Sequence, residues 1–231
     1  MSNYYKYEFL ISEGLEEEFN ENYCEAIKKY SKAITAIPSK TTGYYFRALI
    51  YLDLLYYKNA IEDLNIAILL NPGNYNFIGE RGKAKLALKE YKSALSDFNA
   101  VFKLGPINKK IYELRAITKE KLLDFEGAIE DFSKAILLNP YVYYLFENRA
   151  LVKEKVMDFN GAVNDLSLAI KLYPFKADLY FKRSDIRGLK LKDFTGAIND
   201  LNRGLELDPN INPTCEDLYF KEAFKNINSV N

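Results

Sequence analysis

Prolines recur at a fixed interval along this chain of 231 residues, and that interval constrains its fold more than any other feature. Five prolines stand 34 residues apart and a sixth follows after 35: Pro38, Pro72, Pro106, Pro140, Pro174 and Pro209. An alanine stands twelve residues before each proline: Ala26, Ala60, Ala94, Ala128, Ala162 and Ala197. A self-similar period of this length is typical of repeat architectures, in which each unit is a small supersecondary element that packs against its neighbours.

The spacing within one unit predicts two helices. In the fourth unit, apolar and aromatic residues recur at helical spacing from Lys109 to Leu123. Asp124 then offers a side-chain oxygen for an N-cap, and a second amphipathic segment runs from Phe125 to Leu138. Pro140 prevents that segment from continuing, because proline lacks a backbone donor and clashes with the preceding helical turn. The chain is therefore predicted to be all-α.

This pattern resembles the tetratricopeptide repeat family, whose 34-residue helix–turn–helix unit ends in a proline. The resemblance covers six units: 7–40, 41–74, 75–108, 109–142, 143–176 and 177–211. Aromatic or apolar residues replace the family's tryptophan: Tyr44, Ile78, Tyr112, Phe146 and Tyr180. The resemblance implies a right-handed superhelical solenoid, in which the first helix of each repeat (helix A) lines a concave face and the second (helix B) forms the convex one.

Two features interrupt the repeat pattern near its end. The sixth unit carries one extra residue between Ser184 and Gly196, and we expect a lengthened turn near Leu189–Asp193. After the last repeat, the letters of Asp178–Lys182 recur at Asp217–Lys221. They predict a C-terminal capping helix within residues 212–231, which covers the last apolar face. Residues 1–6 are expected to form an N-terminal tail.

Charged residues recur in the same register. One helix A position holds five arginines and one helix B position five aspartates: Arg47, Arg81, Arg115, Arg149 and Arg183, with Asp63, Asp97, Asp131, Asp165 and Asp200. In the first unit these positions hold Glu13 and Lys29, so both signs are reversed. Because such a swap preserves attraction when the two side chains face each other, we predict a structural ion pair between helices A and B of each repeat.

Composition argues against catalysis, metal binding and nucleic-acid binding. The chain has no histidine, so the commonest general base and metal ligand is absent, and its two cysteines, Cys24 and Cys215, form no metal-binding or redox motif. No glycine-rich phosphate loop occurs. Lys+Arg 32 balances Asp+Glu 32, which disfavours nucleic acid as a partner. We expect a cytoplasmic protein that is not an enzyme, binds no metal or cofactor, and has no membrane span.

Protein binding remains, and the family's register indicates which helix A side chains line the concave face. The candidates are Tyr45, Phe46, Leu49, Glu80, Glu113, Glu120, Tyr144, Glu147, Asn148, Glu154 and Phe181. Glu113 and Glu147 recur at equivalent positions, as do Glu120 and Glu154, so they predict an acidic ladder beside aromatic anchors. Such a face favours a basic and apolar segment of a partner protein. Alternatively, the carboxylates are only solubilising, their charge offset by Lys121 and Lys155.

The sequence also bears on two other functions, the binding of chaperone tails and self-association. Some family members bind acidic chaperone tails through a two-carboxylate clamp of lysine, asparagine and arginine, but no window of three repeats here supplies that set. The other alternative is a self-associating structural component of an assembly. It would use Leu218, Tyr219 and Phe220 on the C-terminal helix. Protein mass measured at several concentrations separates this alternative from a groove that binds a partner.

Overall fold

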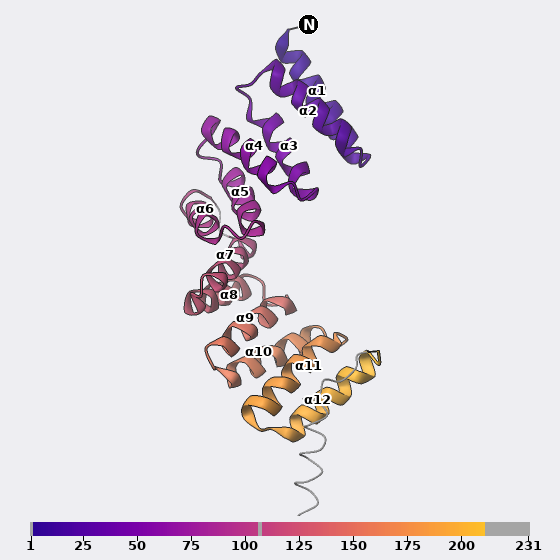
Figure 1. Ribbon diagram of the computed structural model, residues 1–231, viewed down its shortest axis with the longest axis vertical. Helices are drawn as coiled ribbons and strands as arrows, with labels where there is room; N and C mark the ends of the chain where they lie inside the picture. Colours follow the sequence, from indigo (N-terminus) through magenta and orange to yellow (C-terminus); the bar gives the residue numbers. More distant parts are fainter. Residues whose placement is uncertain (1, 106–107, 211–231) are drawn as a thin grey trace, which may run out of the picture. The chain divides into compact units, whose positions relative to one another are not determined.

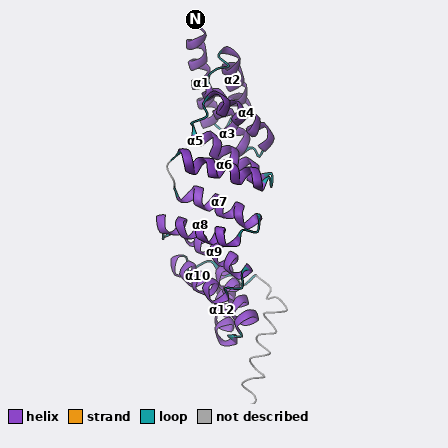
Figure 2. Cartoon of the chain, turned by 90° about the vertical axis from the view of Figure 1, so that its left-hand side faces the viewer, coloured by secondary structure: helices purple, strands orange, loops and turns teal. Residues whose placement is uncertain are grey.

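A computed structural model describes residues 2–105 and 108–210, and within these residues every regular element is a helix (Figure 2). The described helices are α1 (Asn3–Phe19), α2 (Tyr23–Ala36), α3 (Thr41–Asp53), α4 (Tyr57–Leu70), α5 (Tyr75–Ala87), α6 (Tyr91–Leu104), α7 (Lys109–Lys121), α8 (Phe125–Leu138), α9 (Tyr143–Lys155), α10 (Phe159–Leu172), α11 (Ala177–Asp185), a short π-helix η1 (Ile186–Leu191) and α12 (Phe194–Leu207). Odd-numbered helices are the A helices and even-numbered ones the B helices. The predicted all-α fold of paired helices is confirmed.

The turn from helix A to helix B has the same form in all six repeats. One residue in each turn adopts the left-handed conformation, with φ between 59° and 65°: Glu21, Leu55, Lys89, Leu123, Met157 and Lys192. The predicted cap at Asp124 is confirmed, since its side chain accepts a hydrogen bond from the Gly127 N–H at 3.0 Å. A Cβ on Gly127 would lie 2.4 Å from an Asp124 oxygen, so glycine permits this close cap. Asp158 and Asp193 form the same cap with Gly161 and Gly196.

Small residues let the two helices of a repeat approach closely. The alanines that stand twelve residues before each repeat proline, from Ala26 onward, are fully buried. The large residue four positions after each of them, such as Tyr30 or Phe132, is also fully buried. Gly14 shows how tight the approach is, because a Cβ there would lie 2.4 Å from the Tyr30 ring. Burying one such side chain stabilises the fold by about 1.5–3 kcal/mol, so each repeat depends on its helix pair.

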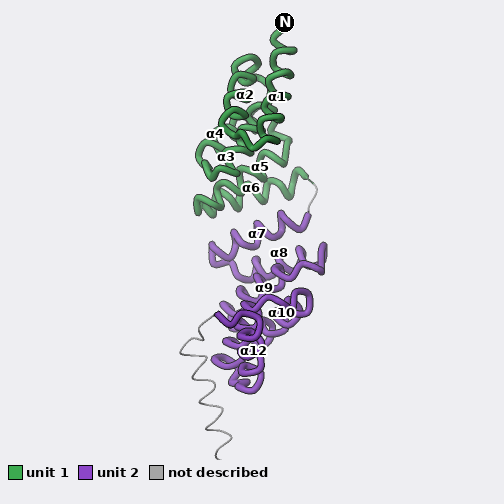
Figure 3. Tube along the Cα trace, turned by 90° about the vertical axis from the view of Figure 1, so that its right-hand side faces the viewer, with its two compact units in different colours: residues 1–107 green, residues 108–231 purple. Residues whose placement is uncertain are grey.

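The chain divides into two compact units, residues 1–107 and 108–231 (Figure 3). Unit 1 contains α1 to α6, and its buried clusters include Tyr7 with Tyr30 and Tyr44 with Phe77. Unit 2 contains α7 to α12, and its buried clusters include Phe132 with Leu145. In each unit, successive helices pair in chain order (Figure 1). Each unit therefore holds three complete repeats with a core of their own.

The N-terminal segment differs from its prediction as a tail. Helix α1 begins at Asn3, so residues 3–6 are helical. The Lys6 N–H bonds to the Ser2 carbonyl at 3.2 Å, and the Tyr4 ring lies 5.0 Å from the Lys40 Nζ. This cation–π contact holds the first turn of α1 against the connection that leads into α3.

The extra residue of the sixth repeat lies in a helix and not in a lengthened turn. Residues Ile186–Leu191 form η1, whose wider turns accommodate one more residue. The turn itself is unchanged, because Lys192 is left-handed and Asp193 caps α12 as in other repeats. The turn prediction is therefore wrong. The predicted capping helix, including Cys215, Leu218, Tyr219 and Phe220, lies outside the described residues.

Candidate functional site

An arginine–aspartate pair links helices A and B within the repeats. Arg149 donates from Nε and Nη2 to the two oxygens of Asp165, at 2.8 and 2.6 Å. The other four pairs have the same two-pronged geometry: Arg47–Asp63, Arg81–Asp97, Arg115–Asp131 and Arg183–Asp200. All five aspartates are buried. The expected residues thus lie together in every one of these repeats, and planar double hydrogen bonds make the contact geometrically specific.

The first repeat carries the reversed pair. Lys29 Nζ lies 3.0 Å from Glu13 Oε2. A lysine cannot form the planar fork of an arginine, so this repeat keeps the charge attraction without the double hydrogen bond.

Sequence reasoning missed a second cation on the same aspartates. Lys153 Nζ lies 2.9 Å from Asp165 Oδ2, so one carboxylate accepts from two basic side chains. The equivalent contacts are Lys85–Asp97, Lys119–Asp131 and Arg187–Asp200. A signal was available, because each of these cations stands four residues after the paired arginine, one helical turn along the same face.

The arginines also reach the preceding repeat, which sequence reasoning missed as well. Arg47 Nη1 donates to Ser31 Oγ at 2.7 Å, and Arg149 Nη1 donates to Ser133 Oγ at 2.9 Å. Arg81 contacts Asn65 and Arg183 contacts Ser167 in the same way. Each of these arginines therefore joins its own two helices to the preceding helix B.

In unit 1, the predicted concave residues Tyr45 and Phe46 contact each other and buried rings of neighbouring helices. The Tyr45 ring lies 4.9 Å from the Phe77 ring and 6.0 Å from Phe46, which in turn lies 5.7 Å from Tyr30. Burial raises the pKa of the Tyr45 hydroxyl, and the nearby Glu80 carboxylate raises it further. Tyr45 and Phe46 are half-buried, whereas Tyr30 and Phe77 are buried, so the first two serve packing as well as offering surface.

The remaining apolar candidates are also half-buried. They are Leu49 in unit 1, and Tyr144 and Phe181 in unit 2. Phe181 packs on α12, since a Cβ on Gly204 would lie 2.5 Å from its ring. Tyr144 lies edge-on to Tyr143, with ring centroids 5.9 Å apart. Phe181 is thus part of the packing inside the sixth repeat, and Tyr144 packs against the buried cluster that includes Phe132 and Leu145.

In unit 2, Glu147 is buried and bound by two lysines, Lys176 at the N-cap of α11 and Lys182 on α11. Its Oε2 accepts from Lys176 Nζ at 2.9 Å and its Oε1 from Lys182 Nζ at 2.5 Å. Burial disfavours the charged form of Lys182, but its hydrogen bonds to Asp178 and Glu147 outweigh that effect and raise its pKa. Both oxygens of Glu147 are therefore occupied within the chain.

The other carboxylates of this face have different surroundings. Glu120 pairs with Lys155 from the next repeat, and Lys121 lies 3.7 Å away, so the lysines expected to offset its charge are in place. Glu154 and Asn148 are half-buried. Glu113 is only 6% exposed, and Lys110 Nζ lies 3.1 Å from its Oε1. Its Oε2 is buried and accepts no hydrogen bond among the described residues.

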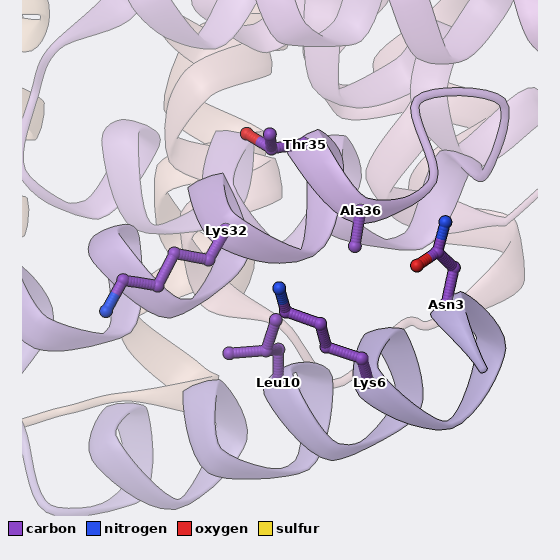
Figure 4. A pocket seen from close by; sticks show the side chains of 6 residues that line it. All are labelled: Asn3, Lys6, Leu10, Lys32, Thr35 and Ala36. Carbon is purple, nitrogen blue, oxygen red and sulfur yellow. The ribbon is translucent and has the colours of Figure 1, made fainter. Parts of the chain in front are cut away.

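Other hollows and reactive groups lie elsewhere. A pocket of about 470 Å³ lies between α1 and α2, where Asn3, Lys6 and Leu10 face Lys32, Thr35 and Ala36 (Figure 4). None of the predicted concave residues lines it.

Cys24 is exposed. The described residues contain no group of three or more acidic or cysteine side chains able to hold a metal ion, and none of their helices is long and apolar enough to cross a membrane.

This chain is similar in sequence to one family model and in fold to several solved structures. The tetratricopeptide repeat model matches residues 41–74 and 177–211. The fold is similar to that of PilF from Pseudomonas aeruginosa, with a TM-score of 0.72 and 17% identity over 96% of this chain and 100% of that one. It is also similar to YrrB, described as a TPR protein with an unusual peptide-binding site, with a TM-score of 0.70 and 16% identity over 84% of this chain and 97% of YrrB.

A third similar structure is MamA from Desulfovibrio magneticus RS-1, with a TM-score of 0.70 and 18% identity over 72% of this chain and 94% of that one. No curated protein matches the chain. Helix pairs in a 34-residue register define an α-solenoid. More narrowly, two segments match the tetratricopeptide repeat model, and the helix pairs have the fold of these neighbours, as the sequence predicted. Proteins with this fold generally act as scaffolds for protein–protein interaction.

Proposed function

We propose that this protein is a non-enzymatic scaffold that binds a basic and apolar peptide or helical segment of a partner protein on its A helices. The sites on offer are the side chains of the A helices that the sequence predicts on the concave face. YrrB, which shares this fold, is described as having a peptide-binding site. The lack of histidine and of a phosphate loop further supports a binding role over catalysis.

The observation that carries this proposal is a contrast within single helices. At one helix A position the five later repeats carry Tyr45, Gly79, Glu113, Glu147 and Phe181. Two residues further on, every one of these repeats carries the arginine of the ion pair. The arginine position is uniform in these repeats, whereas the position two residues earlier on the helix varies. A side that varies in this way can recognise a particular sequence, because specificity requires chemically distinct contacts along the ligand.

Charge on the variable side favours a basic ligand. In unit 2 it carries Glu113, Glu120, Glu147 and Glu154 on α7 and α9. Half-buried Tyr144 adds an aromatic surface of the kind that anchors peptides. Carboxylates next to an aromatic side chain suit a segment that combines lysine or arginine with apolar residues.

The proposal is tested by affinity capture from lysate of the source organism. Wild type is compared with a Tyr144→Ala, Glu154→Lys variant, and a Tyr141→Ala, Glu130→Lys variant makes the same two changes at exposed positions off the A helices. We expect a partner that is retained by wild type and by the control, and lost by the first variant. A partner captured equally by all three would contradict binding on the A helices. Circular dichroism checks that each variant folds.

A further inference from the structure

Glu113 and Glu147 occupy the same position in consecutive repeats but differ in their partners. Each lies on a 13-residue helix A, and each is 6% exposed. Both oxygens of Glu147 accept from lysines. Glu113 accepts from Lys110 at one oxygen only, and the second oxygen is buried and has no partner among the described residues.

The missing partners can be traced in the sequence. Lys176 and Lys182, which bind Glu147, stand 34 residues after Val142 and Asn148. The repeat that follows Glu113 therefore has a valine and an asparagine where the next repeat has two ammonium groups. Neither Val142 nor Asn148 carries a cation, so within residues 2–105 and 108–210 the cation at Glu113 is Lys110, on the oxygen that faces it.

The backbone brings these positions together in both places. Lys182 on α11 reaches back to Glu147 on α9, a separation of 35 residues. Lys155 on α9 reaches back to Glu120 on α7 with the same separation, so α9 stands against α7 in the register in which α11 stands against α9. By this register, Asn148 stands opposite Glu113 where Lys182 stands opposite Glu147.

A buried carboxylate oxygen without a hydrogen bond is costly, and native proteins rarely retain one without a reason. Charge complementarity identifies what would satisfy it. An anionic ligand would be repelled, and a single carboxylate without further acidic or cysteine neighbours does not form a metal site. A cationic side chain would reproduce the contact that Lys182 makes one repeat later.

We propose that Glu113 is the recognition site for one lysine or arginine side chain of a bound peptide, which takes the place that Lys182 occupies beside Glu147. This inference rests on the scaffold function proposed above. The incoming cation donates to Glu113 Oε2 beside Asn148, which carries no charge of its own. Tyr144, which replaces Asp178 of the next repeat, provides an apolar surface for the stem of the bound side chain.

The test uses a displayed library of random peptides selected on the full chain. Binding of the selected peptides is then measured on wild type, Asn148→Lys and Glu113→Gln. Asn148→Lys fills the site with a cation from the chain itself while keeping Glu113. Asn164→Lys on α10 and Glu130→Gln on α8 make the same changes at exposed positions and serve as matched controls.

We expect the selected peptides to share one lysine or arginine, and its replacement by methionine to weaken binding at least tenfold. Asn148→Lys and Glu113→Gln should each weaken binding at least tenfold, and neither control should change it more than twofold. Because the cation and Glu113 contact each other, combining Glu113→Gln with the methionine peptide should cost less than the two losses together.

Three results would overturn the inference. Peptides without a shared cation would do so, and so would peptides that bind wild type and Asn148→Lys equally. If those peptides still lost affinity for the Tyr144→Ala, Glu154→Lys variant, the scaffold function would stand without the Glu113 site. Failure to select any peptide would contradict both proposals. Should Glu113→Gln not fold, Asn148→Lys decides the outcome alone.

Discussion

On the side of each later A helix that faces its helix B, an arginine and an aspartate make the same two hydrogen bonds in five repeats. On the other side of the same helices, the residue two positions earlier changes from one repeat to the next. The first side forms a lattice, because some of its arginines also contact the preceding repeat. The contacts on the first side therefore recur from repeat to repeat, whereas those on the other side differ between repeats. In a solenoid, stability is approximately a sum of such nearest-neighbour terms, so contacts that recur in five repeats contribute in each of them.

The largest expected effect comes from removing one buried aspartate. Asp165→Ala should lower the free energy of unfolding by about 3–5 kcal/mol, because Arg149 and Lys153 remain largely buried without their partner. Urea denaturation measures the change. The control is Asp178→Ala on the variable side, where a half-exposed carboxylate should cost about 0–1 kcal/mol. Equal losses in the two variants would contradict the greater contribution of the buried aspartate to stability.

The reversed pair of the first repeat sharpens the comparison. Lys29→Asp alone sets two carboxylates against each other and should cost about 1 kcal/mol, since the pair is only partly buried. Adding Glu13→Arg restores the order of charges found in the other repeats and should recover that loss. A double-mutant cycle followed by thermal unfolding gives the coupling energy. Zero coupling would mean that this contact contributes nothing to stability.

A gain in stability is expected when the variable side is made uniform. Asn148→Lys should stabilise the protein by about 1 kcal/mol, because the new ammonium group donates to the unpaired oxygen of Glu113. Asn164→Lys, which lies on an exposed part of α10, should change the unfolding free energy by less than about 0.5 kcal/mol. Denaturation midpoints of the two variants distinguish these outcomes, and an equal shift would point to net charge as the cause.

The smallest effect concerns the turns of the lattice. Leu123 is exposed and left-handed, a conformation that costs a leucine about 1 kcal/mol and glycine almost nothing. Leu123→Gly should therefore raise stability by about 0.5 kcal/mol. Leu137→Gly, at an equally exposed position inside α8, should lower it by about 1 kcal/mol. Calorimetry on the pair tests the sign, and destabilisation by both would contradict the role assigned to the turn.

Much of the fold could be predicted because the repeats supply internal comparisons. The 34-residue spacing indicates helix pairs, Asp124 marks a cap, and the reversal at Glu13 and Lys29 indicates which side chains face each other. These inferences depend on local chemistry and on register, both of which are visible in one sequence.

The site was harder to predict, because burial and neutralisation depend on the next repeat. Nothing in the letters of Glu113 and Glu147 shows that one has two lysine partners and the other a free oxygen. That difference appears only when Asn148 and Lys182 are known to stand opposite them. The N-terminal turn was missed for a similar reason, since Tyr4 is held by Lys40, a residue distant in sequence.

The π-helix of the sixth repeat shows how a repeat array can tolerate the insertion of one residue. An added residue in the turn would displace Asp193 from its cap. In η1 it leaves Arg187 on Asp200 and the Asp193 N–H on the Arg187 carbonyl, at 2.8 and 2.9 Å. The period in sequence becomes 35 while both ends of the helix keep their contacts. The wider turns of η1 thus accommodate the inserted residue, and the sixth repeat keeps the ion pair between its two helices.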